Sequence, residues 1–101
     1  MYQFLRSDVF ERWLKGLKDT RAKARILARI RSAEHGNFGD CRPIGDGVSE
    51  MRIHYGPGYR LYYTRRGEVI YLLLVGGDKG SQKRDIKAAL AMAANLGKDQ
   101  S

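Results

Sequence analysis

The sequence predicts an α+β fold, in which a small antiparallel sheet of four strands packs against two N-terminal helices and one C-terminal helix. Apolar residues recur with the 3.6-residue period of a helix in the first third of the chain and again after residue 80. Between them, residues 49–75 alternate with the two-residue period of strands, and glycine-containing turns separate the segments. A chain of 101 residues can bury one core, so we expect residues 1–101 to form one domain.

The N-terminal part is expected to hold a short strand and two helices. Residues 2–5, YQFL, suit a strand, and Asp8 with Glu11 forms a capping-box pattern that predicts a helix start. A second helix follows after a tight connection and is expected to end at Gly36. The predicted buried residues are Phe10, Trp13, Leu14 and Leu17 in the first helix, and Ile26, Leu27, Ile30 and Ala33 in the second.

The rest of the chain is predicted to form a loop, three strands and a helix. Residues 36–48, GNFGDCRPIGDGV, are rich in glycine and are predicted to be a loop. The predicted strands lie near 49–55, 59–65 and 68–75, with turns at Gly56-Pro57-Gly58 and Arg66-Gly67. Gly76 and Gly77 are expected to turn the chain into the last helix, which should end at Gly97. Its predicted buried residues are Ile86, Ala89, Leu90 and Ala93.

The composition is strongly basic. Nineteen lysines and arginines against eleven acidic residues give a formal charge of +8, so we expect a polyanionic partner, with nucleic acid as the first candidate. An anionic membrane surface or an acidic protein would satisfy the same charge. The second helix carries basic residues that form either a solvated face or a surface for phosphate or a partner: Arg21, Lys23, Arg25, Arg29 and Arg31.

Cysteine content and hydropathy indicate the compartment. Cys41 is the only cysteine, so no internal disulfide can form, and together with two histidines it is too little for a structural zinc site. No stretch resembles a signal peptide, and the longest apolar run, VIYLLLV, is too short to span a bilayer. We therefore expect a cytosolic protein without a metal or other cofactor, in which Cys41 and His35 are structural.

The first hairpin is predicted to gather basic side chains on one face. If Tyr55 lies opposite Tyr59, the alternating pattern defines a core face made of Met51, Ile53, Tyr55, Tyr59, Leu61 and Tyr63. The opposite face then brings His54 across from Arg60, and Arg52 across from Tyr62.

The second hairpin extends this predicted face. A turn at Arg66-Gly67 would pair Arg60 with Leu73, Tyr62 with Tyr71, and Thr64 with Val69. Because the last strand is expected to end at Val75, level with the first turn, Lys79 should emerge beside the basic cluster.

Such a cluster suits RNA cleavage. Arg52, Arg60 and Lys79 can hold a phosphate and stabilise the charge that develops on it, and the imidazole of His54 can exchange a proton near neutral pH. The ribose 2′-hydroxyl attacks its own phosphate, so the reaction needs no metal. The two paired tyrosines offer surfaces on which a base can stack. A solvated histidine, solubility charges and tyrosines that only pack are the plain alternatives.

Residues 47–89, GVSEMRIHYGPGYRLYYTRRGEVIYLLLVGGDKGSQKRDIKAA, contain RIHYGPGYR followed by GGDK. On this segment, and on FERWLKGLKD and AKARILARIRSAEHGNFGDCRPIGDGVSE upstream, the chain resembles the phage-derived, HigB-like addiction module killer branch of the RelE/ParE toxin superfamily. Met51 stands where the branch usually has leucine. The resemblance implies a RelE-like fold and a type II toxin–antitoxin system, in which the toxin is an endoribonuclease (an mRNA interferase) that cuts translated messages, often in the ribosomal A site.

The resemblance also implies site residues. The basic positions of RelE-type sites fall on Arg52, His54, Arg60 and Lys79. The best-known RelE enzymes have a catalytic tyrosine in or near the last helix, and this chain has none there, so acid–base chemistry stays open between His54 and Asp78, with Tyr62 and Tyr71 as further candidates. Further expected RNA contacts are Lys83, Arg84 and Lys87 on the last helix, and Arg65 and Arg66 at the second turn.

The superfamily leaves two alternatives open. A ParE-like toxin would poison DNA gyrase without nuclease activity, and an inactive toxin homologue would keep only antitoxin binding. In each case the resemblance implies a small antitoxin, in this branch commonly with a helix-turn-helix DNA-binding domain, so that the complex represses its own operon.

Overall fold

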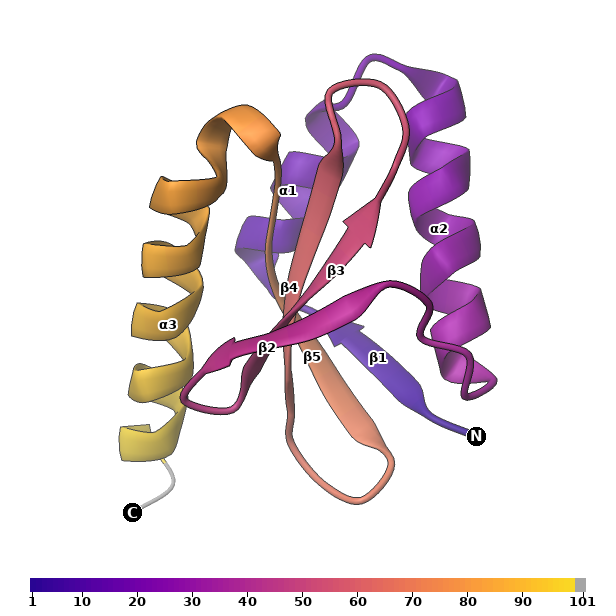
Figure 1. The fold of residues 1–101 in the computed structure, drawn as a ribbon. Helices are drawn as coiled ribbons and strands as arrows, with labels where there is room; N and C mark the ends of the chain where they lie inside the picture. Colours follow the sequence, from indigo (N-terminus) through magenta and orange to yellow (C-terminus); the bar gives the residue numbers. More distant parts are fainter. Residues whose placement is uncertain (100–101) are drawn as a thin grey trace.

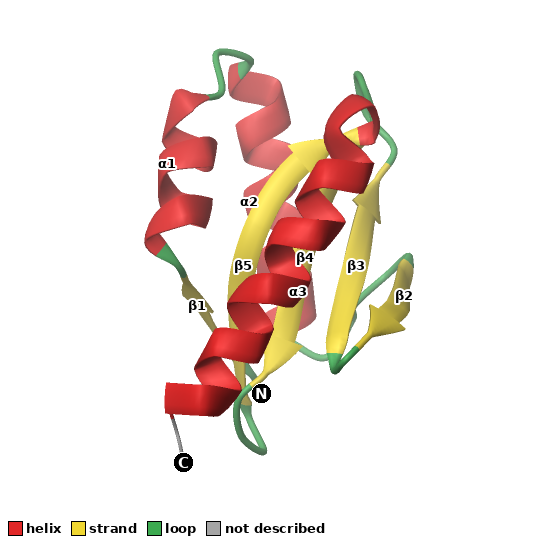
Figure 2. Ribbon diagram, turned by 90° about the vertical axis from the view of Figure 1, so that its left-hand side faces the viewer, coloured by secondary structure: helices red, strands yellow, loops and turns green. Residues whose placement is uncertain are grey.

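A computed structural model describes residues 1–99 and contains five strands and three α-helices in one α+β unit. The elements in chain order are β1 (Gln3–Arg6), α1 (Asp8–Gly16), α2 (Thr20–Glu34), β2 (Cys41–Gly45), β3 (Val48–Ile53), β4 (Tyr59–Arg65), β5 (Ile70–Asp78), a short 3-10 helix η1 (Lys79–Ser81), and α3 (Gln82–Asp99). The strands form one sheet in the order β1-β5-β4-β3-β2 (Figure 1). Figure 2 shows the sheet between the α1–α2 pair and α3.

The predicted α+β class and the two N-terminal helices with one C-terminal helix are confirmed, but the predicted sheet is wrong in two respects. It has a fifth strand, β2, inside the segment predicted to be a loop, and β1 pairs in parallel with β5, so the sheet is mixed. β2 has the sequence CRPIG, and its glycine and proline are typical of loops, so the sequence pattern did not predict a strand there. Pro43 is tolerated there because β2 lies at the edge of the sheet, where an edge strand can leave one donor position empty.

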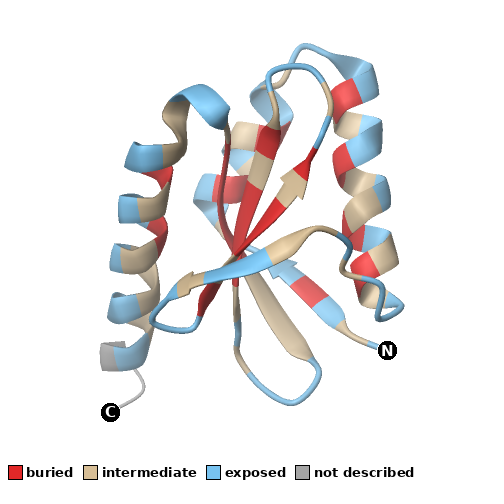
Figure 3. Cartoon of the chain, viewed as in Figure 1, coloured by how far each residue is buried: buried red, intermediate tan, exposed pale blue. Residues whose placement is uncertain are grey.

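The sheet buries a core on each face. On one side Met51, Leu61 and Leu73 pack with residues of α1 and α2, and on the other Tyr62 and Leu74 pack with residues of α3. Figure 3 shows the buried residues along the middle of the sheet and on the sides of the helices that face it. The two helix-covered faces explain why most of β4 and β5 is buried.

The first helices pack against the core with the predicted sides, although Trp13, Leu17 and Leu27 are only half-buried, and α1 begins differently. Ser7, not Asp8, is the N-cap, because its Oγ accepts a hydrogen bond of 3.0 Å from the backbone N–H of Phe10. Glu11 pairs with Arg6 at 2.8 Å and does not complete a capping box. Helix α2 buries Ile26, Ile30 and Ala33 as predicted and ends at Glu34, with His35 as its C-cap before Gly36, which has a positive φ of 95°.

The register of the first hairpin differs from the prediction by two residues. Ile53 pairs with Tyr59, so Arg52 lies opposite Arg60 and not opposite Tyr62, and His54 lies beyond the end of β3. A shift of two residues keeps every side chain on its predicted face, because strand side chains alternate with period two. The predicted face of the basic side chains is therefore correct, although the predicted residue pairs are wrong.

The second hairpin differs more. Tyr62 pairs with Val75, and a register shift between Tyr62 and Tyr63 breaks the alternation, so Tyr62 and Tyr71 neither pair nor share a face. The predicted pairs of Arg60 with Leu73 and of Thr64 with Val69 are also wrong. Thr64 pairs with Leu72, because the connection between β4 and β5 is longer than a turn with Arg66-Gly67 at its tip, and the bulge in β5 adds one more residue, so Arg60 pairs with Gly77.

The two glycines predicted to form a turn lie inside β5 instead. A Cβ on Gly76 would come within 2.1 Å of the Trp13 ring, and one on Gly77 within 1.8 Å of a carboxylate oxygen of Asp85. These positions are glycine because an aromatic ring of α1 and a carboxylate of α3 press against the strand from its two faces. Helix α3 also continues through Gly97 to Asp99, past its predicted end. No helix among residues 1–99 is both long and apolar enough to cross a membrane.

Candidate functional site

Two arginines lie directly opposite each other where β3 and β4 meet their connecting loop. Arg52 and Arg60 are paired residues, on the sheet face opposite the core residues Met51 and Leu61. The Arg60 side chain is 14% exposed and that of Arg52 34%. Like charges facing each other across a strand pair destabilise a sheet unless anions lie between them. The surroundings of the two arginines supply part of that negative charge.

Asp40 joins two of the predicted site residues. Its Oδ1 accepts a hydrogen bond from Arg52 Nη2 at 3.0 Å, and its Oδ2 lies 2.7 Å from Nε2 of His54. The backbone also holds it, because the Arg52 N–H donates to the Asp40 carbonyl at 2.9 Å. The hydrogen bonds from His54 and then Arg52 lower the pKa of Asp40, so its carboxylate is ionised at neutral pH. An ionised carboxylate only accepts hydrogen bonds, so Nε2 of His54 donates.

Asp40 is absent from the predicted site. It lies 14 positions before His54, in a segment predicted to be a loop, and the pairing of β2 with β3 brings the two together. Recognising β2 as a strand antiparallel to β3 is the one signal that could have placed it.

A buried carboxylate lies on the same sheet face beside Arg60. Glu50 is fully buried and pairs across the hairpin with Tyr62. Its oxygens accept hydrogen bonds from Arg42 Nε at 3.0 Å, Gln82 Nε2 at 3.0 Å and Tyr62 Oη at 3.1 Å. Arg60 Nε lies 3.6 Å from Oε2 of Glu50. Burial raises the pKa of Glu50, but the hydrogen bonds from Arg42, Gln82 and Tyr62 outweigh it and the net pKa is lowered.

Tyr62 therefore does not fit its predicted role as a stacking surface. Its ring is fully buried, and its hydroxyl donates to Glu50. Burial, with the adjacent charge of Glu50, raises the pKa of Tyr62 far above its ordinary value, so the phenol is no general acid or base near neutral pH. Tyr62 therefore has a structural role: it helps to hold Glu50, the carboxylate that lies beside Arg60.

Lys79 lies beside the cluster, as predicted. It follows Asp78, which pairs with Tyr59 at the start of β4. A Cβ on Gly58 would lie 3.7 Å from the Lys79 Cβ and 3.9 Å from Arg60 Nη1, so both residues flank this glycine. Figure 1 shows the β3–β4 loop and the start of α3 at the same end of the molecule.

Asp78, a predicted alternative base, has a carboxylate oxygen that accepts hydrogen bonds from backbone N–H groups. Its Oδ1 accepts from the N–H groups of Gly80 at 2.8 Å and Ser81 at 3.2 Å, which caps η1. A carboxylate that caps a helix is held toward backbone donors. The geometry favours His54 over Asp78 for proton exchange with a substrate.

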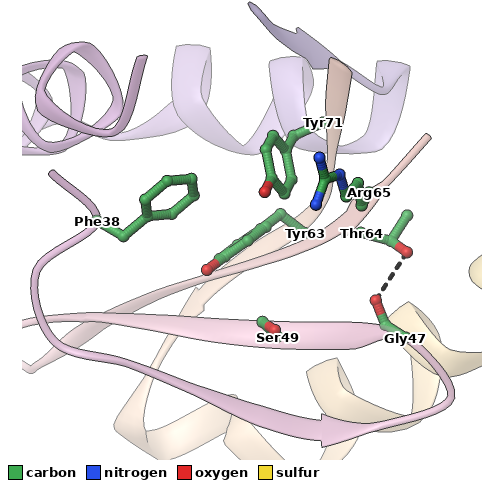
Figure 4. Close-up of a pocket in the computed structure, with 7 residues that line it drawn as sticks. All are labelled: Phe38, Gly47, Ser49, Tyr63, Thr64, Arg65 and Tyr71. Carbon is green, nitrogen blue, oxygen red and sulfur yellow. Dashed lines mark hydrogen bonds between the residues drawn. The ribbon is translucent and has the colours of Figure 1, made fainter. Parts of the chain in front are cut away.

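Of the remaining predicted RNA contacts, Tyr71, Arg65 and Arg66 lie away from the cluster, whereas the basic residues of α3 begin close to it, after Lys79. Tyr71 stacks on Phe4 on the α1–α2 face, where Tyr71, Phe38 and Tyr63 wall a hollow of about 330 Å³ (Figure 4). Arg65 lies over Tyr71, and its guanidinium donates to the carbonyls of Gly67 and Glu68. It is at the far end of β4 from Arg60, as is the neighbouring Arg66. Lys83, Arg84 and Lys87 are exposed on α3.

Comparison with known proteins gives the family. A family described as "Phage derived protein Gp49-like" matches residues 12–96. The chain belongs to this Gp49-like family. A protein of Haemophilus influenzae described as an uncharacterized protein is 49% identical over 88 residues, which cover 87% of this chain and 89% of that protein. The match spans the whole sheet except β1, and so includes the candidate site.

The candidate site of this Gp49-like chain gathers basic side chains, and two of them lie beside carboxylates: Arg52 beside Asp40 and Arg60 beside Glu50. Arg52, Arg60 and Lys79 supply positive charge, and His54 is 75% exposed with one ring nitrogen held by Asp40. Among residues 1–99, the structure brings together no group of three histidine, cysteine or acidic side chains that could hold a metal ion. Such an arrangement can bind a phosphate, stabilise added negative charge on it and exchange a proton.

Proposed function

We propose that this chain is the toxin of a type II toxin–antitoxin system, in the HigB-like branch of the RelE/ParE superfamily, and that it cleaves messenger RNA without a metal. The facing of Arg52 and Arg60 across β3 and β4 carries the proposal. Two opposed guanidinium groups favour an anion between them, and guanidinium forks match phosphate oxygens. The net charge of +8 favours a polyanionic substrate.

In the proposed reaction the ribose 2′-oxygen bonds to the adjacent phosphorus while the bond to the 5′-oxygen breaks. Arg52, Arg60 and Lys79 stabilise the negative charge that the phosphate gains in the transition state. His54 exchanges the proton through Nδ1, because its Nε2 faces Asp40. The 2′-hydroxyl loses a proton, the 5′-oxygen gains one, and the products are a cyclic phosphate and a 5′-hydroxyl.

The proposed partners follow from the same surface. The substrate is messenger RNA, engaged on the translating ribosome. A cognate antitoxin with a helix-turn-helix domain would silence the toxin by laying an acidic or apolar segment over the basic cluster, which neutralises charge and excludes RNA.

The proposal is tested by inducing the chain and mapping breaks in cellular RNA and DNA. We expect growth arrest with cuts inside translated messages, and loss of both in the variant His54→Gln with Arg52→Gln. These two residues are chosen because they are more exposed than Arg60, so their replacement should leave the fold intact. His35→Gln is the matched control, since His35 is an exposed histidine at the C-cap of α2, outside the cluster.

Two outcomes would overturn the nuclease. DNA breaks without message cuts would indicate a gyrase poison, and absence of arrest with retained antitoxin binding would indicate an inactive homologue. Normal cleavage by the folded double variant would reject the site assignment.

A further inference from the structure

We infer that a hollow between α2 and the end of β3 binds the phosphate next to the one that is cleaved in a single-stranded RNA. The inference rests on the proposed function. The hollow has a volume of about 290 Å³ and is lined by Arg25, Ala28, Arg29, Ser32, Ile53 and His54. It lies beside the candidate site, because His54 borders both.

Arg29 is a fixed cation in the wall of this hollow. Its guanidinium donates to the carbonyl of Arg52 at 2.6 Å and to that of Phe38 at 2.9 Å. Gly39 makes room for it, since a Cβ there would lie 2.7 Å from Arg29 Nη2. Carbonyl acceptors orient the guanidinium but do not neutralise it, so Arg29 contributes a positive charge to the wall of the hollow.

Arg25 is a second cation, held in place by an aromatic ring. Its guanidinium carbon lies 4.6 Å from the centre of the Tyr55 ring, within the range of a cation–π contact. Tyr55 is itself tied to α2, because its hydroxyl donates to Asp19 at 3.4 Å. Stacking restricts the long Arg25 side chain before any ligand arrives, which reduces the entropy lost on binding.

No carboxylate lines the hollow, so an anion entering it meets the guanidinium groups of Arg25 and Arg29 and the Ser32 hydroxyl as donors. Two acids lie nearby: Asp40 is bound to Arg52 and His54, and Asp19 accepts from the backbone at the start of α2 and from the hydroxyl of Tyr55. A phosphate matches this set of donors. An acidic peptide would also match the charge. RNA is favoured because His54 borders both this hollow and the candidate site, so an RNA that extends from one to the other would place consecutive phosphates on either side of His54.

The test measures binding without cleavage. A fluorescent single-stranded RNA, 2′-O-methylated throughout, cannot be cut because its nucleophiles are blocked. Its affinity is measured by anisotropy over a series of salt concentrations for the full chain and for Arg25→Gln. We expect the variant to bind about tenfold more weakly and the slope of log K against log salt to fall by about 0.7, the value for one phosphate contact on a single strand.

Arg12→Gln is the matched control, because it removes one exposed charge from α1, away from the hollow. It should change neither the affinity nor the slope appreciably. Equal effects of the two variants would show that only net charge matters and would overturn the inference, as would failure of the full chain to bind the RNA.

The inference and the proposed function fail separately. If Arg25→Gln weakens binding as expected but the full chain cuts no RNA, the hollow is an RNA-binding site and the proposed nuclease activity is wrong. If the full chain cuts messages and Arg25→Gln leaves RNA binding unchanged, the hollow is not a substrate site. Poly-glutamate is added as a competitor. If it binds the chain more tightly than the RNA does, and if Arg25→Gln weakens its binding more than that of the RNA, the hollow is assigned to an acidic protein segment instead.

Discussion

At the scale of single residues, one aspartate decides how the proposed site is arranged. Asp40 accepts from Arg52 and His54 through separate oxygens, so it fixes their relative position as well as their charge. Because it contacts these two side chains and not the reacting phosphate in our proposal, it is a positioning residue. The same carboxylate also orients the ring so that Nδ1 is left for the substrate.

We therefore expect Asp40→Asn to lower kcat for RNA cleavage by about tenfold with a smaller change in KM, since the ring loses its fixed orientation while phosphate binding persists. Asp40→Glu should recover part of kcat. The melting temperature of both variants should stay close to that of the wild type, because exposed ion pairs contribute about 0–1 kcal/mol. A rise in KM with kcat unchanged, or a loss of folded protein in Asp40→Asn, would contradict a positioning role.

At the scale of elements, contacts across the sheet explain residues that the sequence pattern misassigns. The run VGGD continues β5 because Trp13 of α1 and Asp85 of α3 occupy the space that side chains at Gly76 and Gly77 would need. β1 aligns in parallel with β5, an arrangement that requires the intervening helices as a crossover. Neither contact leaves a periodic signal in the sequence.

We expect Gly76→Ala to destabilise the fold by about 2–3 kcal/mol, because its Cβ would overlap the Trp13 ring at 2.1 Å and force α1 away from β5. Gly67→Ala is the matched control, since a Cβ there meets no atom within 4 Å. Urea unfolding at equal protein concentrations measures both. Equal stabilities of the two variants would show that the close contact between α1 and β5 does not constrain this position.

At the scale of the whole molecule, one buried carboxylate ties four elements together. Glu50 of β3 accepts hydrogen bonds from β2, β4 and α3 through Arg42, Tyr62 and Gln82. Such a network stabilises the fold when every member is paired, and removing one partner leaves a buried charge or donor unsatisfied. Glu50 also lies 3.6 Å from Nε of Arg60, so the same network contributes to the stability of the fold and to the position of Arg60 in the proposed phosphate site.

The lowered pKa of Glu50 gives this network a pH dependence of known sign. Its contribution to the free energy of unfolding is complete above the ordinary value of 4.5 and is lost as the pH falls through the lower folded value. We expect Glu50→Gln to cost about 3 kcal/mol near neutral pH, and the difference from the wild type to shrink in acid. Urea unfolding at several pH values measures it. A difference that grows as the pH falls below 4.5 would contradict the lowered pKa.

The sequence by itself determined the class of fold, the three helices, the core positions Ile26 and Leu61, and the face of the hairpin that carries the basic residues. These depend on local periodicity, and a register error of two residues leaves a face unchanged. Only the tertiary structure decided that Arg52 faces Arg60, that Asp40 joins His54, and that Tyr62 is buried. Those contacts depend on strand pairing, loop length and a bulge, which are settled when distant segments pack together and so leave no periodic mark in the sequence.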